Sequence, residues 1–164
     1  MLSLLVKPWR SYTKTTFSKH WMRKHPNLLK DLVADHPEKV FVSDITDLES
    51  DEGTHYLSLV TDACTRKIID YEVSRETKAS DVVKALNMAI AARQSTCTSI
   101  HHSDRCLQYC AGEYQQVLES NGIKPSMTDG YDYYQDALAE RVNGILKQEF
   151  LSYRCKVSMS CSCS

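Results

Sequence analysis

Acidic side chains stand at places in this sequence where a carboxylate could take part in chemistry. The first is Asp44, near the end of the run Val40–Thr46, which is nearly all apolar and rich in β-formers. Such a run predicts a central strand that is buried on both faces. Because an unpaired carboxylate is costly to desolvate, we expect Asp44 to become neutral, to pair or to bind a cation.

The second acidic residue, Asp104, lies just past the end of a short predicted strand in the run Thr98–Asp104. Strand ends in α/β sheets are where functional sites are usually built. His102, two residues earlier, is interpreted as a packing or hydrogen-bonding neighbour rather than as a ligand. Tyr109 and Tyr114 are interpreted as core or rim aromatics.

The third is Glu140, on a predicted amphipathic helix that begins near Tyr134, with 35 residues between Asp104 and Glu140. The helix has one apolar face and one polar face, as a 3.6-residue period requires. The alternative interpretation is an ordinary core helix whose solvated face happens to be charged. The apolar face holds Leu138, Val142, Ile145, Leu146 and Phe150, and the polar face holds Asp136, Glu140, Asn143 and Lys147.

The three residues and their flanking sequences resemble the integrase core of bacterial insertion-sequence DDE transposases, the branch closest to retroviral integrases. The matching motifs are Ser-Asp-Ile-Thr, His-His-Ser-Asp-Arg and Ala-Leu-Ala-Glu-Arg-Val-Asn-Gly-Ile-Leu-Lys-Gln-Glu. The resemblance runs from about Val40 to Phe150, and the spacing and the Asn143/Lys147 pair make it specific. It implies a ribonuclease H-like α/β fold, a mixed five-stranded sheet flanked by helices.

The resemblance also implies that Asp44, Asp104 and Glu140 are catalytic and bind two Mg²⁺ or Mn²⁺ ions. Asp44 would bridge both ions, and the other two carboxylates would each complete one side. Carboxylate oxygens suit hard cations, and a pair of such ions can activate one oxygen and stabilise another during phosphoryl transfer. The implied reactions are DNA 3′-end cleavage and strand transfer into target DNA, by a homo-oligomer assembled on DNA.

The charge distribution predicts where DNA phosphates bind. Residues 1–30 contain seven Lys or Arg and no acidic residue, whereas the remainder holds 13 basic and 21 acidic residues. A basic arm on an acidic body is typical of a phosphate-contacting segment, and a solubilising tail is the alternative. The predicted DNA-binding residues are Lys19, Arg23, Lys24, Asn143 and Lys147.

Some residues depart from the pattern of the resembled family. Cys106 stands where that family usually has Gly, which would cause strain if φ were positive there. Asp136 replaces a usual Asn, and Asp47 a usual aromatic residue. Two further hypotheses therefore stay open: a degenerate, inactive fragment that binds DNA or a full-length partner, and a ribonuclease H-like nuclease without strand transfer.

Three segments are expected along the chain: a basic arm (1–36), an integrase catalytic core (37–151) and an irregular tail (152–164). The tail has no periodicity and is interpreted as a truncation or a shifted reading frame. In the resembled family a DNA-binding region precedes the basic arm, and this chain is expected to begin after that region. Apolar content of 42% and charged content of 25% are those of an ordinary globular domain.

Seven cysteines without a Cys-x-x-Cys pair, and no export signal or membrane-span pattern, predict reduced thiols in a cytoplasm. The resemblance implies that this is a bacterial cytoplasm, in association with the nucleoid. A zinc site can be drawn from four neighbouring side chains, but their spacing matches no structural zinc pattern. These are His101, His102, Cys106 and Cys110.

Periodicity predicts the order of elements in the core. A meander of three strands is followed by helix, strand, helix, strand and the Glu140 helix. A short helix over Asn27–Ala34 is also expected before Pro37, and Thr128–Tyr133 is expected to be a mobile loop. The strands are Val40–Thr46, His55–Thr61, Lys67–Val73, the run before Asp104 and Ile123–Met127; the helices begin at Ser80 and Gly112.

Overall fold

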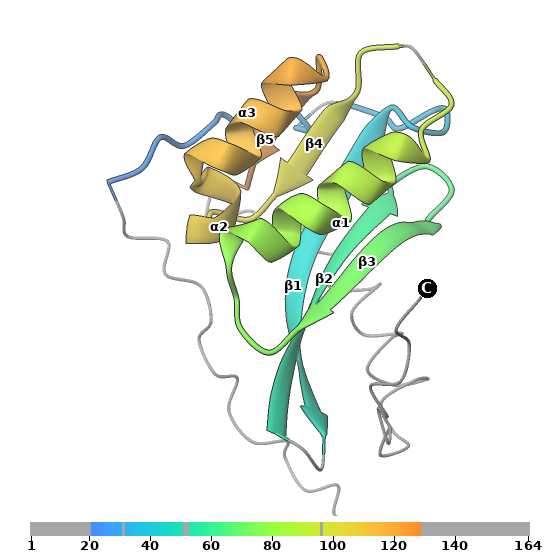
Figure 1. Cartoon of the computed structure of the whole chain (residues 1–164). Coiled ribbons are helices and arrows are strands. Elements are labelled where there is room, and N and C mark those ends of the chain that lie inside the picture. The colour runs from blue at the N-terminus through green and yellow to red at the C-terminus, as the bar shows by residue number, and fades with distance from the viewer. Residues whose placement is uncertain (1–20, 31, 51–52, 96, 129–164) are drawn as a thin grey trace, which may run out of the picture.

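A five-stranded sheet with helices is the framework of the computed structural model, which describes residues 21–30, 32–50, 53–95 and 97–128 (Figure 1). The strand order across the sheet is β3-β2-β1-β4-β5. The mixed sheet confirms the predicted α/β class. In chain order the elements are β1 (Val40–Ser50), β2 (Gly53–Asp62), β3 (Ile68–Ser74), α1 (Ala79–Ala91), β4 (Ile100–Ser103), α2 (Leu107–Cys110), α3 (Gly112–Ser120) and β5 (Lys124–Met127).

The first three strands form an antiparallel meander. Their β-branched and aromatic residues favour extended backbone, and β1 pairs with β2 from Phe41–Asp62 at one end to Ser50–Gly53 at the other. Gly53 has a φ of +122°, a conformation that residues with a side chain rarely adopt, so glycine suits this turn. The long hairpin holds β1 as the central strand, with Asp44 in its middle.

The other half of the sheet is parallel. β4 pairs with β1, Val42 opposite His102, and β5 pairs with β4, Ser103 opposite Met127. Parallel neighbours need crossover connections, which α1 provides before β4, and α2 with α3 before β5. In Figure 1, α1 and α3 lie on the same side of the sheet.

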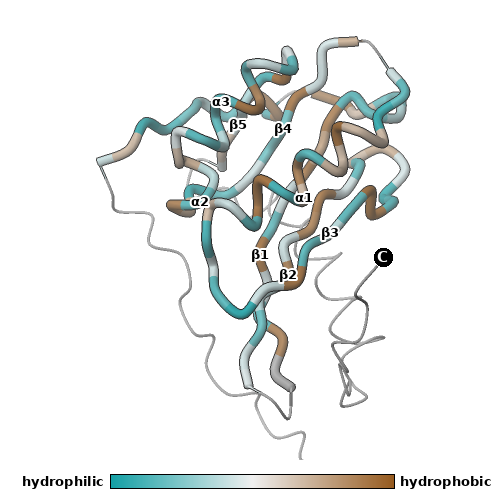
Figure 2. The backbone as a smooth tube through the Cα atoms, in the orientation of Figure 1, coloured by the Kyte–Doolittle hydropathy of each residue, from teal (hydrophilic) through white to brown (hydrophobic). Residues whose placement is uncertain are grey.

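The hydrophobic core lies between the sheet and these helices. Figure 2 shows hydrophobic and hydrophilic residues alternating along α1, as expected for a helix with one buried face. One cluster joins β1, β2 and α1 through Phe41, Val60, Ala85 and Ala89. A second joins the three helices and β5; it includes Val82, Leu86, Cys106, Tyr109, Cys110, Tyr114, Leu118 and Met127.

The helix expected over Asn27–Ala34 is wrong: none of the described residues of this segment is helical. The backbone here bonds to β5 instead. Met127 N–H donates to the Pro26 carbonyl (3.4 Å), and Leu28 N–H donates to Ser126 Oγ (2.9 Å). These tertiary bonds take backbone groups that a helix would need, and Asn27 Oδ1 accepts the Leu29 N–H locally.

Most other elements agree with the sequence analysis. α3 has the predicted bounds, and Asp104 does follow the end of β4. Helix α1 begins at Ala79, one residue before the predicted start at Ser80, and Lys78 is its N-cap. The four-residue α2 was not predicted, because one helical turn shows no period. Among the described residues, no helix has both the length and the apolar character needed to cross a membrane.

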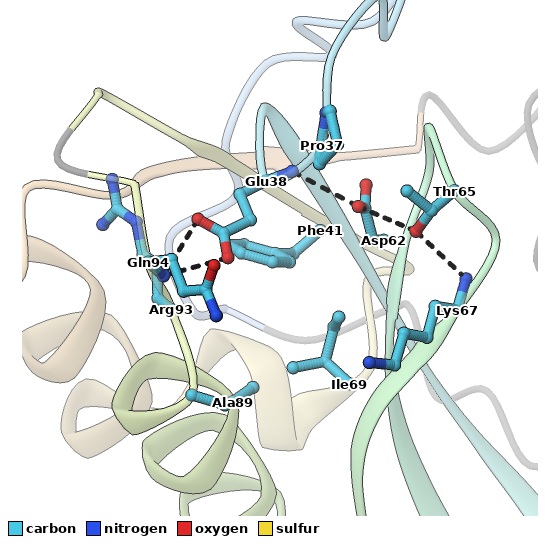
Figure 3. A pocket seen from close by; sticks show the side chains of 11 residues that line it. Pro37, Glu38, Phe41, Asp62, Thr65, Lys67, Ile69, Ala89, Arg93 and Gln94 are labelled. Atoms are coloured by element: carbon cyan, nitrogen blue, oxygen red, sulfur yellow. Dashed lines mark hydrogen bonds between the residues drawn. The ribbon is translucent and has the colours of Figure 1, made fainter.

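Acidic residues tie the connections together at the end of the sheet where β1 and β4 begin (Figure 3). Asp62 is 1% exposed, and its carboxylate accepts bonds from Cys64 N–H, Thr65 Oγ1 and Glu38 N–H. Glu38 in turn accepts backbone N–H bonds from Gln94 and Ser95. Asp62 is therefore a buried structural group at the hairpin turn, and more than the simple hairpin charge that its position suggests.

Candidate active site

Two of the three predicted catalytic carboxylates, Asp44 and Asp104, lie among the described residues, near the point where β4 ends. Asp44 lies on β1, and Asp104 follows Ser103, the last residue of β4. Val42 pairs with His102 in the parallel ladder, so continuing this register places positions 44 and 104 level with each other. Neighbouring strands are about 4.8 Å apart, and both residues are half-buried. The sheet thus brings together two of the three predicted carboxylates.

Asp104 is oriented by Cys106. The Cys106 N–H donates to Asp104 Oδ1 at 3.0 Å, and Cys106 Sγ donates to Oδ2 at 2.8 Å. Burial raises the pKa of the Asp104 carboxyl, and the two Cys106 hydrogen bonds act in the opposite direction. An Asp carboxylate that accepts a hydrogen bond from the N–H two residues on is typical of a turn before a helix. That pattern could have revealed the backbone contact from the sequence, but not the thiol contact.

Cys106 is accommodated without backbone strain. Its φ is −64°, so the strain expected for a positive φ does not arise. The side chain is 8% exposed and packs in the helix cluster. One of the departures that favour a degenerate copy therefore has no structural cost here.

A buried polar cluster lies behind Asp44. His101 Nε2 is 2.7 Å from Ser43 Oγ and 2.8 Å from Tyr114 Oη, which joins β1, β4 and α3. Burial, and then the charge of His102, lower the pKa of His101 to about 3, so the ring is neutral at neutral pH. Burial raises the pKa of Tyr114, so its hydroxyl keeps its proton. The cluster therefore fixes the two acid-bearing strands without adding charge. No sequence motif indicated it.

Tyr109 lies beside both carboxylates. Its ring packs edge-on against Tyr114, with 5.3 Å between ring centroids, and it is 1% exposed. Its hydroxyl is buried and has no hydrogen-bond partner among the described residues. Burial is the first cause of its raised pKa; the charges of Tyr114, Asp44, Asp104 and Cys106 follow. Tyr109 and Tyr114 are thus core aromatics, as interpreted from the sequence.

His102 is a hydrogen-bonding residue, in agreement with the sequence interpretation. It is 2% exposed, and its Nδ1 lies 2.9 Å from Ser126 Oγ on β5. The same Oγ accepts the Leu28 N–H, so this chain of bonds fastens the segment before β1 to the sheet. His102 therefore serves packing on this side of β4.

Two of the predicted DNA-binding residues, Arg23 and Lys24, are described, and both are exposed. Lys24 and Arg105 lie within electrostatic reach of the Cys110 thiol: they lower its pKa, although burial and Asp104 raise it overall. Positive side chains thus approach the end of the sheet that bears the carboxylates. Lys19, Asp136, Glu140, Asn143 and Lys147 lie outside the described residues, as does most of the loop expected at 128–133.

The donor set fits part of a site for a hard cation. Asp44 and Asp104 offer carboxylate oxygens, which Mg²⁺ and Mn²⁺ prefer. Within residues 21–30, 32–50, 53–95 and 97–128, no group of three His, Cys, Asp or Glu side chains could hold a metal ion. The described residues therefore supply only part of such a donor set.

A pocket of about 230 Å³ lies at the other end of the sheet, where β1 begins (Figure 3). Phe41, Ile69 and Ala89 form its apolar part. The acidic residues at its rim are Glu38 and Asp62, whose carboxylates already accept bonds from backbone N–H groups. Their geometry ties loops together, so this pocket is not the candidate site.

Comparison with known proteins agrees with this geometry. The family model for the integrase core domain matches residues 34–132. A protein of Shigella sonnei, the insertion element IS600 uncharacterized 31 kDa protein, is 37% identical over 93% of this chain and 56% of its own length. Transposase InsF for insertion sequence IS3fB, from Escherichia coli K12, is 33% identical over 89% of this chain and 51% of its own. The chain spans about half the length of these curated relatives.

Solved structures show the same fold. The HTLV-2 integrase catalytic core domain, in complex with magnesium, superposes with a TM-score of 0.58 at 19% identity, covering 71% of this chain and 72% of that one. The simian T-cell lymphotropic virus intasome, in complex with a PP2A regulatory subunit, superposes with a TM-score of 0.65 at 22% identity, covering 85% of this chain and 48% of that one. The sheet and helices described above therefore have the ribonuclease H-like fold of retroviral integrase cores.

Proposed function

Because the chain belongs to the integrase core domain family, we propose that it is the catalytic domain of an insertion-sequence transposase, a metal-dependent polynucleotidyl transferase. The observation that carries this proposal is the parallel pairing of β1 with β4, Val42 opposite His102, because continuing this register puts Asp44 level with Asp104, which directly follows β4. Paired carboxylates at a strand end suit phosphoryl transfer, which needs hard cations beside the reacting phosphate.

Asp44, Asp104 and Glu140 would together hold two Mg²⁺ or Mn²⁺ ions. When bound, the ions supply an activated oxygen nucleophile and neutralise charge on the phosphate. The 35-residue spacing from Asp104 supports Glu140 as the third carboxylate, on a helix that the sequence predicts. The magnesium in the HTLV-2 integrase core supports the choice of ion.

The remaining residues bind DNA or position the carboxylates. Cys106 orients the Asp104 carboxylate, and the neutral group of Ser43, His101 and Tyr114 holds β1 against β4. Cationic side chains bind DNA phosphates by charge, without reading base sequence. These cations are Lys19, Arg23, Lys24 and Lys147, with Asn143 as a polar contact.

The proposed reactions are cleavage at the element's 3′ ends by water and transfer of the new 3′-hydroxyl to target DNA. Both reactions would take place on DNA that is bound by a homo-oligomer, and the similarity to the intasome structure supports such an assembly. We place the catalytic core at 37–151, after a basic arm at 1–36 and before a tail at 152–164, in a bacterial cytoplasm on the nucleoid. The family match over 34–132 supports the central segment.

A cleavage and strand-joining assay tests the proposal, with the element's own flanking ends as substrate and Mg²⁺ or Mn²⁺ present. Asp44→Asn, Asp104→Asn and Glu140→Gln should each lower the rate ~100-fold or more, because the bound ions contribute several kcal/mol to the transition state. Asp70→Asn, on β3, is the matched control and should act like the parent. A parent that cleaves no better than Asp104→Asn would favour an inactive fragment, and cleavage without strand joining would favour a plain nuclease.

A further inference from the structure

The contact between Cys106 and Asp104 uses both oxygens of the carboxylate. The backbone N–H holds Oδ1 at 3.0 Å, and the thiol holds Oδ2 at 2.8 Å. One bond alone would let the carboxyl group rotate about its Cβ–Cγ axis, whereas two bonds from the same residue fix the plane of the group. The thiol therefore decides which way Oδ2 faces.

Packing holds the thiol in place. Cys106 begins the turn into α2 with φ −64° and ψ 151°, and its side chain is buried in the cluster that includes Tyr109 and Cys110. A side chain fixed by such packing does not turn freely toward solvent. The S–H group therefore stays aimed at the carboxylate while the fold is intact.

We propose that Cys106 is a positioning residue that weakens cation binding at Asp104, because its thiol occupies the oxygen Oδ2. A cation that binds Oδ2 shares this oxygen with the S–H proton, and each positive partner weakens the interaction of the other. The proposal rests on the proposed function, which makes Asp104 a metal ligand. It adds that the side chain at 106 tunes the metal affinity of this chain.

The expected change in Mn²⁺ affinity follows from the strength of the hydrogen bond between the Cys106 thiol and the Asp104 carboxylate. A hydrogen bond to a charged group changes an equilibrium constant by a net factor of about ten or more, but a thiol is a weak donor. Removing the thiol while keeping the backbone N–H should tighten Mn²⁺ binding about three- to tenfold. Mn²⁺ is the probe because it takes the same oxygen ligands as Mg²⁺.

The variants separate the thiol from the packing around it. Cys106→Ala removes the donor, and Cys106→Ser keeps a donor at the same place. Cys110→Ala is the matched control: its thiol is buried in the same cluster, 6% exposed, but contacts Met127 Sδ at 3.8 Å. Asp104→Asn removes the charged acceptor. All are made in the full chain.

Two measurements are made on each variant. Calorimetric titration gives the affinity for Mn²⁺. The S–H stretching band of Cys106, taken from the Raman difference between the parent and Cys106→Ala, gives the hydrogen bond directly and needs no metal. In the parent this band should be shifted to lower frequency, and the shift should shrink when the same difference is taken in an Asp104→Asn background.

We expect tighter Mn²⁺ binding by Cys106→Ala, binding by Cys106→Ser that is no tighter than that of the parent, and parent-like binding by Cys110→Ala. Parent-like binding by Cys106→Ala, with loss of binding by Asp104→Asn, would overturn this proposal alone and leave the proposed function intact. Weaker Mn²⁺ binding by Cys106→Ala would also overturn it, since the sulfur would then be a ligand. If neither the parent nor any variant bound Mn²⁺, the metal site of the proposed function and this proposal would fall together.

Discussion

Asp62 and Asp104 make the same local turn at opposite ends of the sheet, yet their surroundings differ. Each accepts a hydrogen bond from the backbone N–H two residues on, at Cys64 and Cys106. Asp62 also accepts bonds from Thr65 of the same turn and from Glu38 of a distant segment, and it is 1% exposed. Among the described residues, Cys106 alone donates to the Asp104 carboxylate, which is half-buried. A carboxylate that joins two distant segments is structural, whereas one bound by its own turn remains available to a ligand.

The largest expected effect follows from removing each carboxylate in turn. Asp62→Ala leaves donors of three residues without their acceptor, two of them backbone N–H groups, so the free energy of unfolding should fall by about 3 kcal/mol. Asp104→Ala loses bonds from Cys106 alone and also removes a carboxylate that burial disfavours, so it should cost less than about 1 kcal/mol. Urea unfolding without metal measures both. Equal losses would remove the distinction between the two ends.

The next effect concerns pH and the neutral cluster at the carboxylate end. The pKa of His101 is lowered to about 3 in the fold from 6.5, so only the unfolded chain takes up the proton as pH falls below 6.5. Stability is therefore full above pH 6.5 and is lost toward acid, by about 2 kcal/mol between pH 7 and pH 5.

His101→Gln should flatten this loss, although His25, whose pKa burial also lowers, contributes in the same direction. Exposed His36→Gln is the control and should keep the parent's dependence. Unfolding curves at several pH values check this. A slope in His101→Gln as steep as that of the parent would show that the ring is not held neutral.

A smaller effect is expected from the basic residues, which differ in their role at the two ends of the sheet. Arg23→Ala with Lys24→Ala should lower the slope of log K for DNA against log salt concentration by about 0.9 for each lost phosphate contact. Lys67→Ala with Lys124→Ala removes two exposed cations from the opposite end and should leave the slope unchanged. Fluorescence anisotropy with duplex DNA at several salt concentrations measures it. Equal changes in both pairs would show that phosphate binding is not directed to the carboxylate end.

The smallest expected effect is that of the Tyr109 hydroxyl. It is buried without a partner among the described residues, so Tyr109→Phe should leave the metal-free stability unchanged or raise it by up to about 1 kcal/mol. Tyr114→Phe is the matched control: it loses the bond to His101 and should be destabilised by about 1 kcal/mol. Thermal melts compare the two. A larger loss for Tyr109→Phe would mean that its hydroxyl has a partner after all.

The sequence predicted the frame of this site better than its details. Asp44 in an apolar run and Asp104 after a strand indicated their positions, because burial and strand ends leave local patterns. The register that sets them level depends on pairing between distant segments, which no local pattern encodes. The helix expected at 27–34 failed for the same reason, since bonds to β5 replaced local ones. The thiol contact of Cys106 depends on one side-chain orientation, and the sequence raised only the question of its φ.

The central claim is that Asp44 and Asp104 share bound cations. A double-mutant cycle in Mn²⁺ affinity tests it, using the parent, Asp44→Asn, Asp104→Asn and the double variant in calorimetric titrations. If the two carboxylates act on the same ions, each single variant should lose at least about tenfold in affinity, and the double variant little more than either. Losses that multiply in the double variant, or single variants that bind like the parent, would contradict the account.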